Sequence, residues 1–255
     1  KLSAIIPCVL EQNHFEQTYS DVMWQKLKTG TGVYKVVWDS HKLHGLGDIS
    51  VERCNLLNLY WEPGVTDIQK SRYFFHTELF DKDVLEQLYP HVKDKLKGQS
   101  FVSTKFLYDD HVNTENKCTV VEVYYHKYVG RKNTLQYCKY VDDQVLYATE
   151  NEMEPIADAV TGQVKPPMAI SGLYDHGKFP YVFDALYPIE GSPCGYGYVD
   201  ICRNPQTVID LLNTSFVKNA MVGATPRYFR RSDGGVNAEQ FLDLSQPLVD
   251  VSGNL

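Results

Sequence analysis

The sequence lacks the short motifs that mark common catalytic and nucleotide-binding sites. Neither a GxxxxGK[ST] phosphate loop nor a GxSxG turn around a nucleophilic serine occurs in its 255 residues. Gly195 and Gly197 precede a predicted helix, but the third glycine of a dinucleotide-binding fingerprint is missing. Glu150 and Glu152 lie in an acidic stretch where solvation is expected, whereas a glycosidase needs two carboxylates across a cleft. We therefore predict no catalytic residue, no cofactor and no enzymatic activity.

Cysteine pairs with the spacing of metal ligands are also missing. None of the six cysteines forms a CxxC pair, and in a chain of this length without a signal peptide we expect reduced thiols in a cytosolic setting. His41, His44 and Asp48 fall in a glycine-rich turn, where their spacing carries little geometric information. We predict solvated loop histidines there and no metal site. The cysteines are Cys8, Cys54, Cys118, Cys138, Cys194 and Cys202.

Positive charge and long apolar runs are scarce. The formal net charge of −7 argues against a protein that grips nucleic acid through a generally basic face, although it allows one past which DNA slides. No apolar run approaches the roughly 18 residues of a membrane helix, so we predict no membrane partner. The chain starts at Lys1 without a methionine, directly in the apolar stretch Leu2–Leu10, and ends without a clear stop. We expect an internal piece of a longer protein.

Aromatic residues, by contrast, are abundant, with 18 Tyr, 11 Phe and 3 Trp. Tyrosine offers a large amphipathic contact area, which favours broad interaction surfaces or a carbohydrate site. A tyrosine-rich β core with hydrated edges is an equally good interpretation. The chain is long enough for one large domain or two small ones, each with its own core.

Hydrophobic periodicity predicts an α+β fold of helices and antiparallel hairpins. A helix is predicted over Phe15–Thr29, with Asn13 as its cap and Gly30 as its exit. A hairpin follows, and a meander of three strands lies between residues 118 and 149. The acidic region 142–158 is a candidate surface loop or subdomain boundary. The predicted strands are Val33–Trp38, Ile49–Cys54, Leu56–Tyr60, Ser71–Leu79, Cys118–Val129, Thr134–Val141, Val145–Thr149 and Phe179–Phe183, with a short helix at Asp81–Tyr89.

The clearest helix signal follows the glycine turn Gly195–Gly197. Asn204 is a good cap, Pro205 suits the first helical position, and Gly223 lies at the end. The predicted helix, Pro205–Val222, has about 18 residues and a length of about 27 Å. Its apolar residues recur every four positions and form one stripe. They are Val208, Leu212, Phe216 and Ala220.

One basic cluster follows this helix. Arg227, Arg230 and Arg231 occur within five residues and could contact a phosphate backbone or an acidic partner subunit. A basic strand edge that is protected from self-pairing is the alternative interpretation.

Four segments in order resemble the portal protein of tailed bacteriophages, or of prophages in Gram-positive bacteria. They are Trp24–Val33, Asn58–Arg72, His176–Val182 and the segment from Tyr187 through Asn213. The resemblance runs from about Phe15 to Arg231. Each segment alone is modestly specific, but four in sequence make chance a poor explanation.

The resemblance implies a structural ring, usually of twelve subunits, at one vertex of the viral head. Double-stranded DNA passes through such a ring during packaging and ejection. The implied partners are further copies of the chain, the major capsid and scaffolding proteins, the large terminase and the head-completion proteins. The implied location is the capsid portal vertex of the virion, after assembly in the bacterial host cytoplasm.

The resemblance also implies a division of the chain. Residues 1–193 would form an α+β wing-like domain, 194–224 a glycine turn with a stem-like helix, and 225–255 the start of a clip-like region. A second stem helix and the crown, which the family pattern includes, would lie beyond Leu255. Two alternatives stay open at this point: another virion module, such as a tail adaptor or baseplate part, and a hydrolase-like α+β enzyme.

Overall fold

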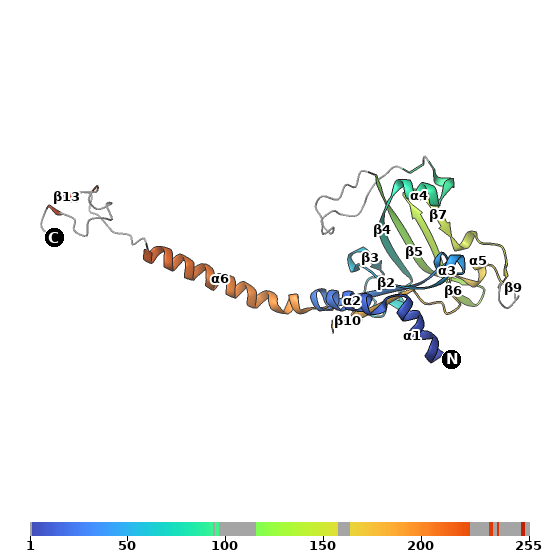
Figure 1. Ribbon diagram of the computed structural model, residues 1–255, viewed down its shortest axis with the longest axis horizontal. Coiled ribbons are helices and arrows are strands. Elements are labelled where there is room, and N and C mark those ends of the chain that lie inside the picture. Colours follow the sequence, from blue (N-terminus) through green and yellow to red (C-terminus); the bar gives the residue numbers. More distant parts are fainter. Residues whose placement is uncertain are drawn as a thin grey trace. The chain divides into compact units, whose positions relative to one another are not determined.

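The structure, a computed structural model, describes residues 2–93, 95–96, 116–157, 164–224, 235–236, 239 and 251–252. The chain forms two compact units, Lys1–Ile201 and Cys202–Leu255. Antiparallel sheets and helices occur together in the first unit (Figure 1), so the predicted α+β class is confirmed. Its helices are α1 (Leu2–Gln12), α2 (Phe15–Thr29), α3 (Lys42–Gly45), α4 (Lys82–Leu88) and α5 (Met168–Ser171), and α6 (Tyr198–Ala224) crosses the boundary between the units.

The larger sheet of the first unit is antiparallel, with the order β3-β4-β5-β6-β7. Its last three strands form the predicted meander, because Gly130 and Asp142 occupy the two turns with positive φ. The predicted strand over Leu56–Tyr60 is partly wrong. Residues Leu56–Asn58 form a 3-10 helix, capped by the Asn55 side chain, which accepts a hydrogen bond from Leu57 N. The strands are β3 (Leu59–Trp61), β4 (Tyr73–Asp81), β5 (Lys117–Val129), β6 (Lys132–Val141) and β7 (Gln144–Ala148).

A smaller three-stranded sheet has the order β10-β1-β2. The hairpin of β1 (Thr31–Asp39) and β2 (Asp48–Arg53) confirms the prediction from sequence. Strand β10 (Tyr181–Ala185) pairs with the other edge of β1, so that Val33 lies opposite Phe183. The pairing joins segments about 150 residues apart in the sequence, which local periodicity does not reveal.

Two apolar clusters fill the interior. The first joins the three-stranded sheet to the five-stranded sheet, and the second lies under α4. Aromatic rings dominate the first cluster: the Phe74 and Tyr181 ring centroids are 4.3 Å apart. The tyrosine-rich β core is therefore the better explanation of much of the aromatic content. The first cluster is Val33, Cys54, Leu59, Ile68, Phe74, Tyr124, Leu135, Phe179 and Tyr181; the second is Leu85, Val92, Leu96, Cys118, Val120, Val141 and Leu146.

Helix α2 has the bounds that periodicity predicts, but its N-terminus differs. His14, with φ 49°, stands at the cap position and makes no side-chain cap bond. Asn13 is not the cap. Its amide donates to Val9 O, and its oxygen accepts hydrogen bonds from Lys42 Nζ and Val51 N. The predicted cap is wrong because α1, a helix that was not predicted from the local sequence pattern, engages Asn13 at its own C-terminal end.

Of the acidic region 142–158, the described residues 142–157 are part of the fold, and the two units divide elsewhere, after Ile201. These residues contribute β7, the 3-10 helix Thr149–Asn151 and the short strand β8 (Ile156–Ala157). Glu150 is not simply solvated, because Tyr125 Oη donates to its carboxylate at 2.6 Å and Lys127 Nζ lies at 2.9 Å. The remaining short elements are 3-10 helices at Ile68–Lys70 and Pro90–Val92, β9 (Val164–Lys165), β11 (Tyr187–Pro188), β12 (Gly195–Tyr196), β13 (Gly235–Val236) and β14 (Val251–Ser252).

Candidate subunit interface

The start of α6 is fixed by a backbone-to-backbone contact within the first unit. Gly30, the left-handed C-cap of α2 with φ 85°, packs against the Gly195–Gly197 turn, and Gly195 N donates to Thr31 Oγ1 at 2.8 Å. A Cβ on Gly197 would lie 2.6 Å from the nitrogen of Gly30, so the turn requires glycine there. The rings of Tyr187 and Tyr196 stack beside it at 5.0 Å. The glycine turn therefore holds the end of α2 and the start of α6 together.

Helix α6 starts earlier than the sequence predicts. Asn204 is not its cap and Pro205 is not its first residue, since the helix already begins at Tyr198. Gly197 N donates to the Asp200 carboxylate at 3.0 Å, and Ile201 N donates to Gly197 O at 3.3 Å. These local bonds nucleate the extra turns, and Pro205 then lies inside the helix, where it removes one backbone hydrogen bond. The predicted start is wrong because Asp200 already bonds the preceding Gly197 N, so the helix begins before the cap-and-proline signal of Asn204 and Pro205.

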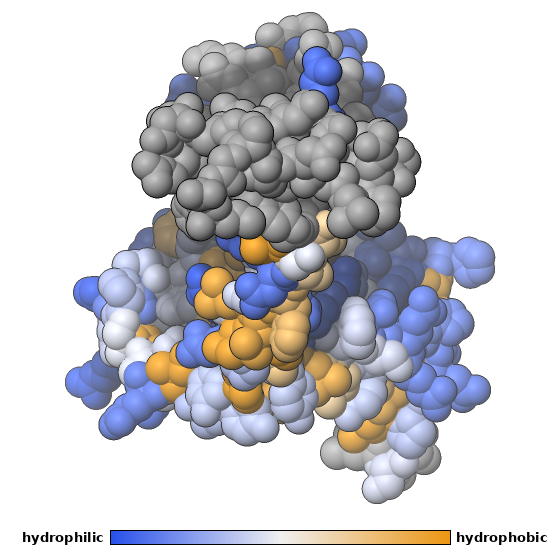
Figure 2. Space-filling view, turned by 90° about the vertical axis from the view of Figure 1, so that its left-hand side faces the viewer, coloured by the Kyte–Doolittle hydropathy of each residue, from blue (hydrophilic) through white to orange (hydrophobic). Residues whose placement is uncertain are grey.

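The apolar stripe predicted for this helix is exposed to solvent. Every residue of α6 is exposed: Val208 exposes 55% of its surface, Leu212 54% and Phe216 72%. Ile201, Pro205 and these three fall on one face of a 3.6-residue helix. Hydrophobic residues are visible at the surface in Figure 2. An uncovered stripe of this length marks an interaction surface, because monomeric proteins rarely expose large contiguous apolar patches.

The charged residues of α6 lie on the face opposite this stripe, together with the apolar Val217 and Met221. Asp200 and Asp210 are matched in number by Arg203 and Lys218 within Tyr198–Ala224. Hydroxyl groups on this helix bond back to its own carbonyls: Thr207 to Arg203, Thr214 to Asp210 and Ser215 to Leu211. The four charges of α6 sum to zero, so the face that carries them has no net charge.

A second uncovered apolar surface lies between α1 and the three-stranded sheet. This groove of about 470 Å³ is lined only by apolar surface, and Ile5 and Ile6 on its rim are 55% and 54% exposed. Its floor alternates along the strands, as expected for one face of a sheet. The lining residues are Ile5, Ile6, Val9, Leu10, Phe15, Tyr34, Val36, Ile49, Val51 and Val182.

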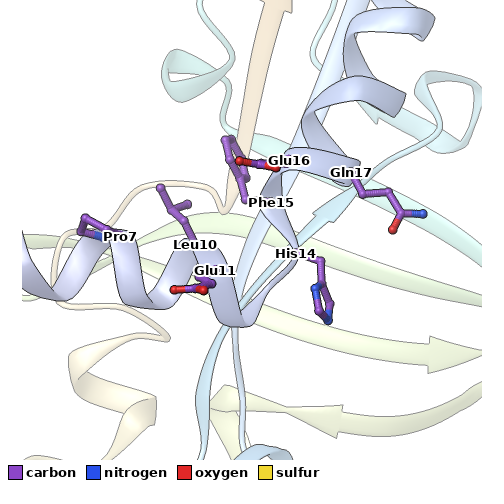
Figure 3. Close-up of a pocket in the computed structure, with 7 residues that line it drawn as sticks. All are labelled: Pro7, Leu10, Glu11, His14, Phe15, Glu16 and Gln17. Carbon is purple, nitrogen blue, oxygen red and sulfur yellow. The ribbon is translucent and has the colours of Figure 1, made fainter.

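A neighbouring hollow lies outside the corner between α1 and α2. Figure 3 shows that Phe15 and His14 point to opposite sides of the chain at this corner, while Glu11 and Glu16 add two carboxylates to the lining. In the part of the chain that the structure describes, no three His, Cys, Asp or Glu residues are placed to hold a metal ion. The hollow therefore offers mixed polar surface and no defined ligand set.

The sequence-predicted contact residues cannot be placed. Arg227, Arg230 and Arg231 lie outside the described residues. Within the described ranges, no helix is both long enough and apolar enough to cross a membrane.

The sequence analysis missed α1 and the groove beside it, although the apolar stretch Leu2–Leu10 was a visible signal for both.

A comparison of the sequence with protein-family models shows which family the chain belongs to. The family model described as the phage P22-like portal protein matches residues 1–167. This chain is a member of the P22-like portal family. The match covers well over half of the chain and includes the segments Trp24–Val33 and Asn58–Arg72. No protein with a curated function is similar enough to this chain to count as a match.

Portal proteins are structural components of the phage virion and not enzymes. They assemble as oligomers at a capsid vertex and connect head to tail. The family match ends before the segments His176–Val182 and Tyr187–Asn213. What is said of the glycine turn and α6 therefore rests on their geometry and not on the family match. The family match supports the portal resemblance of the four sequence segments. The exposed amphipathic helix α6 is consistent with a chain that assembles with others.

Proposed function

We propose that this chain is a portal subunit that assembles into a ring and lines the channel through which double-stranded DNA enters and leaves the phage head. The observation that carries the proposal is the uncovered apolar stripe of α6, in a chain that belongs to the portal family. Burying a side chain such as Leu212 or Phe216 contributes about 1.5–3 kcal/mol, so a neighbouring copy gains stability by covering the stripe. The ring number we expect is twelve.

The charge of the chain supports a channel that does not hold DNA. A protein that neutralises many phosphates binds DNA tightly and would slow its passage. The net charge of −7 and the balanced charges of α6 both avoid such tight binding. We propose that α6 directs the face with its balanced charges toward DNA and its apolar stripe toward neighbouring subunits.

We assign three functional regions along the chain. Residues 1–193 form the wing, 194–224 the glycine turn and stem helix, and 225–255 the start of the clip. The glycine turn supports the boundary near residue 194, because its backbone contact with Gly30 sets the direction in which α6 starts.

We propose further that the assembled ring docks the large terminase during packaging and the head-completion proteins afterwards, and that it contacts the capsid and scaffolding proteins during assembly. Arg227, Arg230 and Arg231 are our proposed partner contacts, to an acidic subunit or to a phosphate backbone. Replacing all three with alanine should reduce terminase or DNA binding and flatten its salt dependence. An unchanged salt dependence would remove this role.

Electron microscopy tests the proposal most directly. The complete gene product, purified and imaged in negative stain, should show rings with a central hole. The Leu212→Asp/Phe216→Asp variant should remain as separate subunits with an unchanged far-ultraviolet circular dichroism spectrum. Particles of the parent protein that stay monomeric over the same concentration range would overturn the ring and, with it, the channel.

A further inference from the structure

A buried charged cluster lies between the two sheets, and the proposed portal function makes no use of it. Lys35 on β1 donates from Nζ to Glu122 Oε2 on β5 at 2.8 Å. The two residues are only 8% and 7% exposed. A buried ion pair is costly to desolvate, and its net contribution to stability is often close to zero. Its presence between two apolar clusters therefore requires another explanation.

Glu122 is fully engaged by groups from several strands. Its Oε2 faces His76 Nδ1 at 3.1 Å as well as Lys35, and its Oε1 accepts from Tyr137 Oη at 3.0 Å. Lys139 Nζ lies 3.7 Å from Oε1. His76, Glu122, Tyr137 and Lys139 all belong to the five-stranded sheet, on β4, β5 and β6. Lys35 is the one member of this cluster that comes from the three-stranded sheet.

The apolar residues around Lys35 do not define a position by themselves. Side chains of a strand alternate between its two faces, so Val33, Lys35 and Val37 share one face of β1. A shift of β1 by two residues would place one of these valines at the present position of Lys35, and Lys35 at the position of the other valine. The same shift would leave Glu122 without its lysine and move the ammonium group of Lys35 into apolar surroundings. Isolated buried charges cost several kcal/mol each, so the shifted arrangement is less stable than the native one by that amount.

We propose that the Lys35–Glu122 contact is a register lock, which selects a single docking position of the three-stranded sheet on the five-stranded sheet. The lock goes beyond the portal function and concerns how the first unit reaches one native packing. Apolar contacts drive the two sheets together, and the ion pair makes one docking position more stable than the others. The lock reaches the helices as well, because β1 follows α2 through Gly30 and so ties the end of α2 to the same position.

The test compares three variants in the full 255-residue chain: Lys35→Met, Glu122→Gln and the double variant. Each single variant leaves a buried charge without its partner, and its folding constant in urea should fall by about 10²–10³-fold. The double variant removes both charges, keeps an oxygen that can accept from Tyr137 Oη, and should recover to within about tenfold of the parent. The Val33 and Val37 methyl groups of the double variant should then give more than one set of NMR signals.

A matched control uses an ion pair of the same sheet that does not join the two sheets. Lys117 and Asp81 are 3.0 Å apart on β5 and β4, with side chains 27% and 59% exposed. The Lys117→Met/Asp81→Leu variant should change the folding constant by only a few-fold and keep one set of valine signals.

Two results would overturn the lock. In the first, the double variant recovers its stability and keeps one set of valine signals with the parental NOEs from Val33 to the aromatic rings of the first apolar cluster. In the second, the double variant is as unstable as the single variants, which would make the pair a net stabiliser. The double variant remains informative even where a single variant does not fold.

Discussion

Gly30 lies directly against the backbone of Tyr196, so closely that a Cβ at Gly30 would overlap the Tyr196 carbonyl carbon. The contact joins the C-terminal cap of α2 to the short strand that precedes α6. Leu186 N donates to Gly30 O at 2.8 Å and strengthens the same joint. Two segments about 165 residues apart thus meet without any side chain between them.

Gly30→Ala should lower the free energy of unfolding by about 3 kcal/mol, because alanine is strained at φ 85° and its methyl group overlaps backbone. Urea unfolding followed by circular dichroism measures the change. Gly223→Ala is the matched control, since nothing lies within 4 Å of the position that its methyl group would take and the residue is helical. That substitution should raise stability by up to about 1 kcal/mol. Equal effects of the two substitutions would contradict the close contact.

Leu212→Asp with Phe216→Asp should weaken self-association at least about tenfold, because two charges would replace apolar side chains on the exposed stripe of α6. Analytical ultracentrifugation of the complete gene product gives the association constant. Thr207→Asp with Thr214→Asp places the same charges on the face opposite the stripe and should change the association constant much less. If both pairs have the same effect, the stripe is not the subunit contact.

Glu122 should make the stability of the first unit sensitive to acid. Burial alone would raise the pKa of its carboxyl group, but the hydrogen bond from His76 and the charge of Lys35 hold that pKa well below the ordinary 4.5. A lowered folded-state pKa contributes stability above pH 4.5, and this contribution is lost as the pH falls below that value. The difference in free energy of unfolding between the parent and Glu122→Gln should therefore narrow as the pH falls from about 5 toward about 3. Asp81→Asn, on the exposed pair with Lys117, should leave the pH profile nearly unchanged. A constant difference would contradict the buried ionised carboxylate.

Thiol labelling should distinguish the exposed cysteines from the buried Cys54. Cys8 and Cys202 are exposed and should react with Ellman's reagent in the native protein. Cys54 is buried, and burial raises the pKa of its thiol to about 12, so little thiolate is available. Cys54 should react only after unfolding in urea, at a rate that follows the unfolded fraction. Rapid native labelling of a Cys54-only variant would contradict its place in the first apolar cluster.

Much of the architecture could be predicted from sequence wherever local signals were strong. The bounds of α2, the first hairpin and the three-stranded meander follow from apolar periodicity and from glycine at turns that need positive φ. The portal resemblance could be read from ordered motifs, and the family match over 1–167 confirms the family. Errors occurred at helix starts, where Asn13 and Asn204 carry good cap chemistry but are engaged elsewhere or lie inside a helix.

The sequence by itself determined most of the elements, though not α1 or the 3-10 helix Leu56–Asn58, because propensity and periodicity act over a few neighbouring residues. It also determined that α6 has one apolar face, and that the chain as a whole is acidic. Only the tertiary structure decided that β10 pairs with β1, that Gly30 meets the 195–197 turn and that Lys35 reaches Glu122. These contacts join residues from about 90 to 165 positions apart, and their energy comes from burial and charge pairing that no local pattern encodes.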